Sequence, residues 1–277
     1  MLAIAMVSVQ SGAALVKGLF PIAGVAGATT LRLVLASLML ALVWRPWRLR
    51  CKRQERRAIL IYGASMGLMN FLFYSSLERI PLGIAVAVEF TGPLGVAIAA
   101  SRRPVDFLWI ALAATGIVAL LPLGSDSRML SVTGLCYALG AGICWALYIV
   151  FGQRAGAAHG GATAALGTAV GAALITPFGL AQAGPALLSP GLLPAACGVA
   201  LLSSALPYSL EMYALTRLPT RTFGVLMSAE PALGALSGFG FLGERLSALQ
   251  WAAIASIMIA SGGSAATSGP SLPPLKD

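Results

Sequence analysis

The stretch LERIPLGIAVAVEFTGP (residues 77–93) returns in outline, 138 residues later, as LTRLPTRTFGVLMSAEP (residues 215–231). The aligned residues are Leu77 with Leu215, Arg79 with Arg217, Pro81 with Pro219 and Pro93 with Pro231. The offset is half the length of the 277-residue chain. Self-similarity at a fixed offset is typical of repeated structural units, so the sequence predicts two halves with one fold.

The apolar composition places both halves in a membrane. Hydrophobic residues make up 58% of the chain and charged residues 10%, whereas about a quarter of the residues are charged in a typical soluble domain. The mean hydropathy is +0.88. So few charges cannot cover a soluble surface, and so apolar a chain is not disordered. We therefore expect an all-α polytopic membrane protein.

Ten apolar segments have about the length that a helix needs to cross the hydrocarbon, roughly 20 residues. They lie near 2–20, 24–44, 58–77, 82–101, 105–123, 130–152, 162–182, 191–214, 220–241 and 247–266. They are too long and too uniformly apolar for the strands of a membrane barrel. Met1 leads into the first segment without the basic region of a signal peptide, so we expect that segment to be a span.

The Lys and Arg residues orient these spans, because both are enriched in short cytoplasmic segments. With both termini in the cytoplasm, thirteen of the eighteen lie inside: Arg45, Arg48, Arg50, Lys52, Arg53, Arg56, Arg57, Arg102, Arg103, Arg154, Arg217, Arg221 and Lys276. Those outside are Lys17, Arg79, Arg128 and Arg245, and Arg32 lies within a span. We expect the Lys17 side chain to reach the outer interface.

Five spans in each half is an odd number, so the second half must cross in the opposite sense to the first. Inverted repeats of this kind are common in secondary transporters, with the substrate site where the halves meet. The predicted fold is thus ten transmembrane helices in two inverted five-helix repeats around a central cavity. The repeats occupy 1–128 and 129–266, and a flexible cytoplasmic tail follows at 267–277.

Several classes of function are disfavoured by the motifs that the chain lacks. A GxxxxGK[ST] phosphate loop is missing, and the four cysteines and the single histidine, His159, have no metal-binding spacing. We expect no cofactor, no metal and no enzyme activity. The net charge of +9 is explained by orientation rather than by nucleic acid. A nucleotide carrier should place several cations in its cavity, where only Arg32 qualifies, and a channel should show pore-lining rings.

Ionisable residues within the spans are the first candidates for function, since a charge at membrane depth costs roughly 2.5–3.5 kcal/mol. They are Arg32, Glu89, Glu211 and Glu230. Glu89 and Glu230 stand shortly before Pro93 and Pro231, and a proline removes an N–H and breaks the helix. Either these glutamates contact a cation or ammonium group or carry a proton, or they bond structurally to freed backbone.

Uncharged polar residues extend this site. Ser204, Tyr208 and Glu211 follow the i, i+4, i+7 spacing of one helical face, and the repeat offset aligns Asn70 with Tyr208. We therefore expect one central cavity lined by spans from both halves. The predicted substrate-binding residues are Gln10, Asn70, Tyr74, Glu89, Trp145, Tyr148, Ser204, Tyr208, Glu211 and Glu230.

Glycine pairs predict where helices approach closely. A GxxxG spacing leaves a flat helix surface on which another backbone can pack. The pairs are Gly63 with Gly67, Gly167 with Gly171, and Gly234 with Gly238.

Six stretches spread along the chain resemble the drug/metabolite transporter superfamily with paired EamA-type repeats. They are SVQSGAALVKGLFP (8–21), PLGIAVAVEFTGPLGVA (81–97), SRRPVDF (101–107), GQRAG (152–156), ALPYSLEM (205–212) and ALTRLPTRTFGVLMSAEPALGALSG (214–238). Within the superfamily the chain is most similar to the threonine/homoserine exporters of bacterial inner membranes.

This resemblance implies a secondary transporter that exports small amino acids across the inner membrane by alternating access, with protons as the candidate exchange partner. Related members export aromatic amino acids, so these, another small metabolite or a drug are the alternative substrates. We expect the ammonium of a zwitterion to meet a carboxylate such as Glu89 or an aromatic face. Its carboxylate is expected at a half-helix N-terminus near a proline break.

Overall fold

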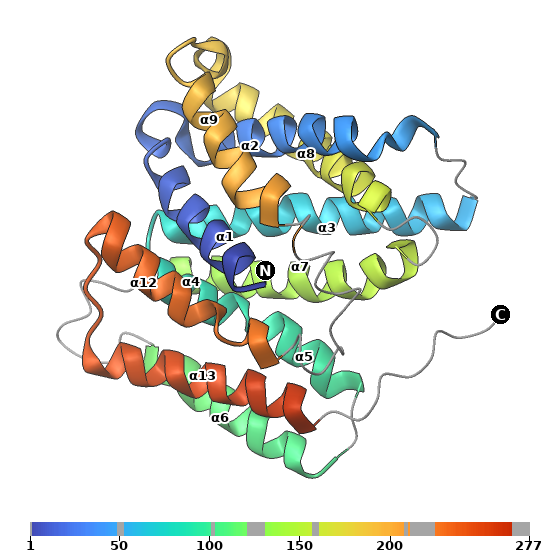
Figure 1. Ribbon diagram of the computed structural model, residues 1–277. Helices are drawn as coiled ribbons and strands as arrows, with labels where there is room; N and C mark the ends of the chain where they lie inside the picture. Colours follow the sequence, from blue (N-terminus) through green and yellow to red (C-terminus); the bar gives the residue numbers. More distant parts are fainter. Residues whose placement is uncertain are drawn as a thin grey trace.

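The computed structural model describes residues 2–48, 53–100, 103–120, 131–156, 161–207, 210 and 225–267. All regular structure in these residues is helical (Figure 1). Within these described ranges, six helices are long and apolar enough to cross a membrane, and four shorter helices are apolar as well. Every predicted segment overlaps one of these helices, so the prediction of an all-α membrane protein is confirmed. The predicted tail lies outside the described residues except for Thr267.

The described helices are distributed over both halves of the chain. The first half contains α1 (Leu2–Lys17), α2 (Phe20–Trp44), the short η1 (Pro46–Arg48), α3 (Arg53–Leu77), α4 (Leu82–Glu89), α5 (Thr91–Ala100) and α6 (Val105–Leu120). The second half contains α7 (Val132–Gly156), α8 (Gly161–Ala183), η3 (Gly184–Leu188), α9 (Leu193–Ala200), the π-helix η4 (Leu201–Ala205), α12 (Glu230–Leu242) and α13 (Ala248–Thr267).

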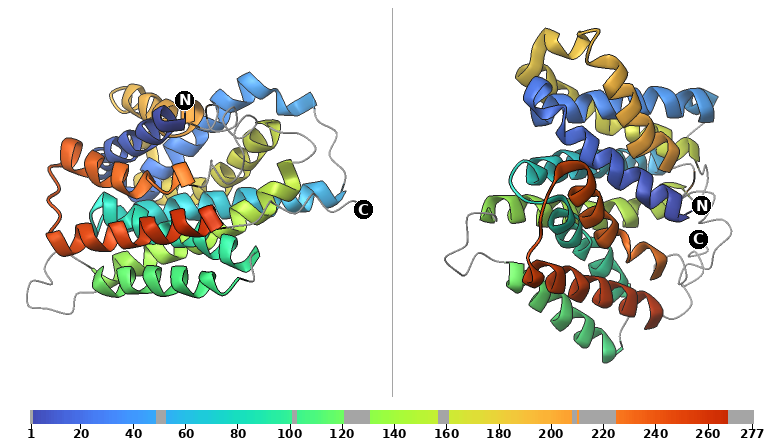
Figure 2. Two further views of the ribbon diagram at one scale, coloured as in Figure 1. Left: turned by 60° about the horizontal axis from the view of Figure 1, so that its bottom comes forward. Right: turned by 60° about the vertical axis from the view of Figure 1, so that its left-hand side comes forward.

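Helices from the two halves lie side by side. α2 contacts α8, α3 contacts both α7 and α8, α4 contacts α12, and α6 contacts α13. Figure 1 shows α3 and α7 in the middle of the bundle, with α2, α8 and α9 on one side and α6 and α13 on the other. The turned views of Figure 2 show the same arrangement, with α1 next to α12. The largest cluster of buried apolar residues joins these helices.

Paired glycines bring α3 and α8 into backbone contact. A Cβ atom on Gly67 would lie 2.7 Å from the Cα atom of Gly171, and one on Gly63 would lie 2.6 Å from the carbonyl oxygen of Gly167. Gly234 of α12 likewise faces Val86 of α4. The predicted close approach at the glycine pairs is therefore confirmed.

Proline interrupts one helix in each half. α4 ends at Glu89, Phe90 forms a turn, and α5 begins at Thr91. Pro93 has no N–H to offer to the carbonyl of Glu89 four residues earlier, which ends the regular bonding there. In the second half, a turn at residues 228–229 precedes α12, whose second residue is Pro231. The predicted breaks at Pro93 and Pro231 are therefore found.

A kink in α2 lies beside the end of α8. Gly24 adopts φ 64° and ψ 176°, which only glycine adopts readily. The backbone N–H of Ala26 donates instead to Oε1 of Gln182 at 2.7 Å. The side chain of α8 thus replaces the backbone partner that the kink removes from α2.

One carboxylate joins three segments where α4 begins. Oε1 of Glu244 lies 2.7 Å from Nζ of Lys17, at the end of α1, and Oε2 accepts the backbone N–H of Leu82 at 2.8 Å. Nearby, a Cβ atom on Gly83 would lie 2.6 Å from Cα of Ala235, so α4 and α12 touch. Lys17 is therefore an ion-pair partner of Glu244, and its place at the outer interface stays a prediction.

Replacing Gly67 by alanine should weaken the α3–α8 contact, because the new methyl group would overlap the Gly171 backbone. Overpacking of this kind costs about 1–3 kcal/mol. The thermal unfolding midpoint of the purified protein in detergent should fall for Gly67→Ala. Gly95→Ala is the matched control, since a Cβ atom there meets nothing within 4 Å. Equal midpoints for the two variants would contradict this account.

Candidate functional site

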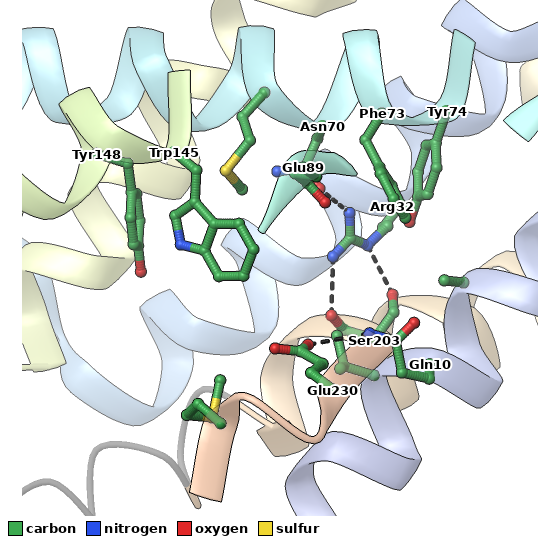
Figure 3. Close-up of a pocket in the computed structure, with 14 residues that line it drawn as sticks. Gln10, Arg32, Asn70, Phe73, Tyr74, Glu89, Trp145, Tyr148, Ser203 and Glu230 are labelled. Atoms are coloured by element: carbon green, nitrogen blue, oxygen red, sulfur yellow. Dashed lines mark hydrogen bonds between the residues drawn. The ribbon is translucent and has the colours of Figure 1, made fainter. Parts of the chain in front are cut away.

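A polar cavity of about 120 Å³ lies between helices of both halves (Figure 3). That volume has room for several water molecules or one small organic molecule. Its walls come from α1, α2, α3, α4, α7, η4 and the region around the start of α12. The lining residues are Val9, Gln10, Ala13, Arg32, Met69, Asn70, Phe73, Tyr74, Glu89, Trp145, Tyr148, Ser203, Met227 and Glu230.

Seven of the predicted substrate-binding residues line this cavity together: Gln10, Asn70, Tyr74, Glu89, Trp145, Tyr148 and Glu230. Tyr208 and Glu211 lie outside the described residues. Ser204 is buried but is not on the cavity wall, where Ser203 stands instead. The prediction for Ser204 assumed an α-helical face, whereas Leu201–Ala205 is a π-helix, whose wider turns shift each residue around the axis.

Arg32 of α2 is the centre of the hydrogen-bond network in the cavity wall. Its Nε donates to Oγ of Ser203 at 2.6 Å, one terminal nitrogen donates to the Ser203 carbonyl at 2.8 Å, and the other donates to Oδ1 of Asn70. Asn70 is held in turn because its Nδ2 donates to the carbonyl of Met66 at 2.8 Å. Arg32 is buried, with 4% of the residue exposed, and these bonds use three of the five N–H groups of its guanidinium.

Aromatic rings make the rest of the wall rigid. The Tyr74 ring lies 5.3 Å from the guanidinium carbon of Arg32, a cation–π distance. Trp145 meets Phe90 edge to face at 5.2 Å, and Tyr148 stacks on Tyr62 at 4.8 Å. The rings that face the cavity are thus fixed by Arg32 or by rings behind them, and they present a preformed surface to a ligand.

Two carboxylates face this single cation. Nε2 of Gln10 donates to Oε1 of Glu230 at 3.0 Å, which joins α1 to the first residue of α12. Glu89 stands at the break between α4 and α5, 7% exposed, and its carboxylate has no hydrogen bond to the described residues. Among the described lining residues, the cavity therefore holds one fixed positive charge and two acids.

Sequence reasoning missed Ser203 and the role of Arg32. The position of Arg32 within a span was a usable signal, since a charge at that depth nearly always faces protein or a cavity. Its partners were not predictable, because Ser203 lies 171 residues away in the sequence. Phe73, Met69 and Met227 line the cavity without any polar signal in the sequence.

Asn70→Leu should leave one N–H of Arg32 without its acceptor. A hydrogen bond to a charged group is worth about 1.5–3 kcal/mol, and burying the donor unpaired adds to the loss. We expect a lower unfolding midpoint in detergent for Asn70→Leu, whereas Asn70→Asp keeps the acceptor and should retain most of the stability. An Asn70→Leu protein as stable as Asn70→Asp would contradict the network described above.

Comparison with known proteins finds that the chain is similar to membrane transporters. A model of the EamA-like transporter family matches residues 132–264. The threonine/homoserine exporter RhtA of Salmonella typhimurium is 57% identical over 266 residues, which cover 96% of this chain and 90% of that protein. RhtA of Escherichia coli K12 is 56% identical over the same shares. The uncharacterized transporter YwfM of Bacillus subtilis is 29% identical over 82% of this chain and 79% of that protein.

A solved crystal structure has the same fold. It aligns with a TM-score of 0.65 and 18% identity, over 95% of this chain and 94% of the other. The sequence match to the two RhtA proteins covers nearly the whole of this chain and most of theirs. This chain therefore belongs to the EamA-like transporter family of multi-pass membrane proteins, within the drug/metabolite transporter superfamily.

Proposed function

We propose that this protein exports small amino acids, threonine and homoserine first among them, across the inner membrane. The observation that carries the proposal is the 57% identity, over 96% of the chain, to a relative named threonine/homoserine exporter. A cavity that offers both a guanidinium and carboxylates suits a zwitterion, because each end of the ligand meets the opposite charge. A polyanionic nucleotide would need more cations than Arg32.

The chain forms ten membrane crossings in two inverted repeats, 1–128 and 129–266, with both termini in the cytoplasm. The directions of the contacting helices support this arrangement. Gly24 lies against Gln182 while Gly161 lies against Trp44, so α2 and α8 run antiparallel. α4 and α12 also run antiparallel, since Leu82 neighbours Gly238 and Val86 neighbours Gly234. α2 and α8 occupy equivalent places in the two repeats, as do α4 and α12. A two-fold axis in the membrane plane makes equivalent helices run in opposite directions.

Substrate binds in the polar cavity and leaves by alternating access. The cavity lies between the two halves, beside the broken helices that carry Glu89 and Glu230, and inverted-repeat transporters bind substrate at discontinuous helices near the bilayer midplane. Glu89 carries the exchanged proton, because it reaches the cavity without a hydrogen-bonded partner among the described residues. The small cavity favours short polar side chains over the aromatic amino acids, metabolites or drugs that relatives could carry.

Counterflow in proteoliposomes tests the substrate. Vesicles loaded with unlabelled homoserine should accumulate labelled threonine, because a carrier exchanges ligand across a closed membrane whereas a channel does not. Phenylalanine inside the vesicles should drive little uptake. Strong exchange with phenylalanine alone would replace this proposal with an aromatic amino-acid exporter, and rapid leak without exchange would favour a channel.

Glu89→Gln tests the proton route. The amide keeps the size of the side chain but cannot take up and release a proton. We expect an imposed pH gradient to stop driving efflux in this variant, while counterflow continues because exchange of substrate for substrate needs no proton.

Asn70→Ala should reduce both efflux and counterflow, by about tenfold for each 1.4 kcal/mol of lost binding, because Arg32 loses its neighbour. Unchanged efflux and unchanged substrate affinity in both the Glu89 and Asn70 variants would show that this cavity is not the transport site.

A further inference from the structure

Two buried oxygen atoms in the cavity wall lack hydrogen-bond partners. They are Oε1 of Gln10 and Oε2 of Glu230, for which the described part of the chain supplies no donor. Both residues are more than nine-tenths buried, at 4% and 6% exposure. An amide carbonyl and a carboxylate can only accept hydrogen bonds, and native proteins rarely leave such groups unpaired when buried.

These two acceptors belong to one preformed unit. Gln10 and Glu230 are held together by the bond from Nε2 to Oε1, 3.0 Å long, and both side chains line the cavity. Gly234, one turn after Glu230, leaves room beside them, since a Cβ atom there would lie 3.2 Å from Oε1 of Gln10. A larger residue at this position would crowd the free oxygen.

The unit also contains an acidic group without a basic partner among the described residues. Glu230 is the first residue of α12, where the helix dipole favours a negative group. The ion pairs between described residues join Lys17 to Glu244 and Arg79 to Glu78, and neither lies on the cavity wall. Arg32 directs three of its N–H groups to Ser203 and Asn70. A cationic ligand would therefore supply the positive charge and the hydrogen-bond donors that the described residues do not offer to Gln10 and Glu230.

We propose that Gln10 and Glu230 form the subsite for the primary ammonium group of the transported amino acid. The assignment rests on the proposed export function and moves the ammonium from Glu89, where the sequence suggested it, to Glu230. An ammonium offers three donors and no acceptor, which complements two free acceptors on an anionic pair. Figure 3 shows Gln10 and Glu230 beside Ser203, on the side to which the Arg32 guanidinium points. The ligand carboxylate faces that guanidinium.

The test compares a substrate with the same molecule lacking its amino group. Full-length protein in liposomes exchanges labelled homoserine, and either unlabelled homoserine or 4-hydroxybutyrate competes. Wild type should prefer homoserine by at least about tenfold, because a site built for a donor rejects a ligand without one. In Glu230→Gln this ratio should fall towards one, and in Gln10→Leu it should fall part of the way. The ratio within one variant does not depend on how much protein is folded.

The matched control is Glu78→Gln, the same change of carboxylate to amide at a half-exposed position outside the cavity. It should keep the wild-type ratio. If Glu230→Gln no longer exchanges substrate, the ratio is read from the rise in unfolding midpoint that each ligand causes in detergent, since a bound ligand stabilises the folded state. A wild-type ratio in Glu230→Gln would overturn the subsite.

Two further outcomes are decisive. If sodium ions alone raise the midpoint of wild type but not of Glu230→Gln, the free oxygens hold a metal cation and the ammonium assignment is wrong. If wild type exchanges no amino acid, the proposed function itself fails, and the subsite fails with it.

Discussion

A guanidinium buried among apolar helices must be hydrogen-bonded on several sides, and the cavity is built around this requirement at Arg32. Its partners lie on α3 and η4, so one side chain of α2 holds the two halves of the chain together. Removing one partner of such a buried charge is strongly destabilising, so this wall keeps its shape. Gln10 and Glu230, by contrast, each keep one buried oxygen without a hydrogen-bond partner among the described residues. The cavity therefore combines a cation that is fixed by its neighbours with acceptor oxygens that have no hydrogen-bond donor among the described residues.

Helix periodicity and the repeat predicted which faces meet, but not which atoms bond. Asn70 and Tyr74 share a helical face in the sequence and line the cavity together in the structure, although their role in binding stays a prediction. Ser204 was misplaced because a π-helix changes the face that each residue occupies. The partner of Lys17 was not predictable, because Glu244 lies 227 residues away in the sequence. Long-range polar contacts of this kind leave no periodic trace in the sequence.

Glycine and proline residues determine where helix backbones touch each other and where a helix is interrupted. Glycines let α3 approach α8 and α4 approach α12 until main chains touch, and in lipid such close packing replaces the hydrophobic effect as the force between helices. Pro93 ends the regular bonding of α4, and Pro231 lies in the first turn of α12. Both kinds of position were visible in the sequence because they depend on a single residue type. The fold was consequently more predictable than the polar network inside it.

The contact of Glu244 with Lys17 and with the Leu82 amide has a consequence for the energetics of a transport cycle. The two charged side chains are 27% and 13% exposed, so this ion pair is intermediate between a fully exposed one, which contributes about 0–1 kcal/mol, and a fully buried one. A deeply buried pair at the same place would resist separation far more strongly. The contact that joins α1, α4 and the segment after α12 should therefore separate more easily during transport than the more deeply buried Arg32 network.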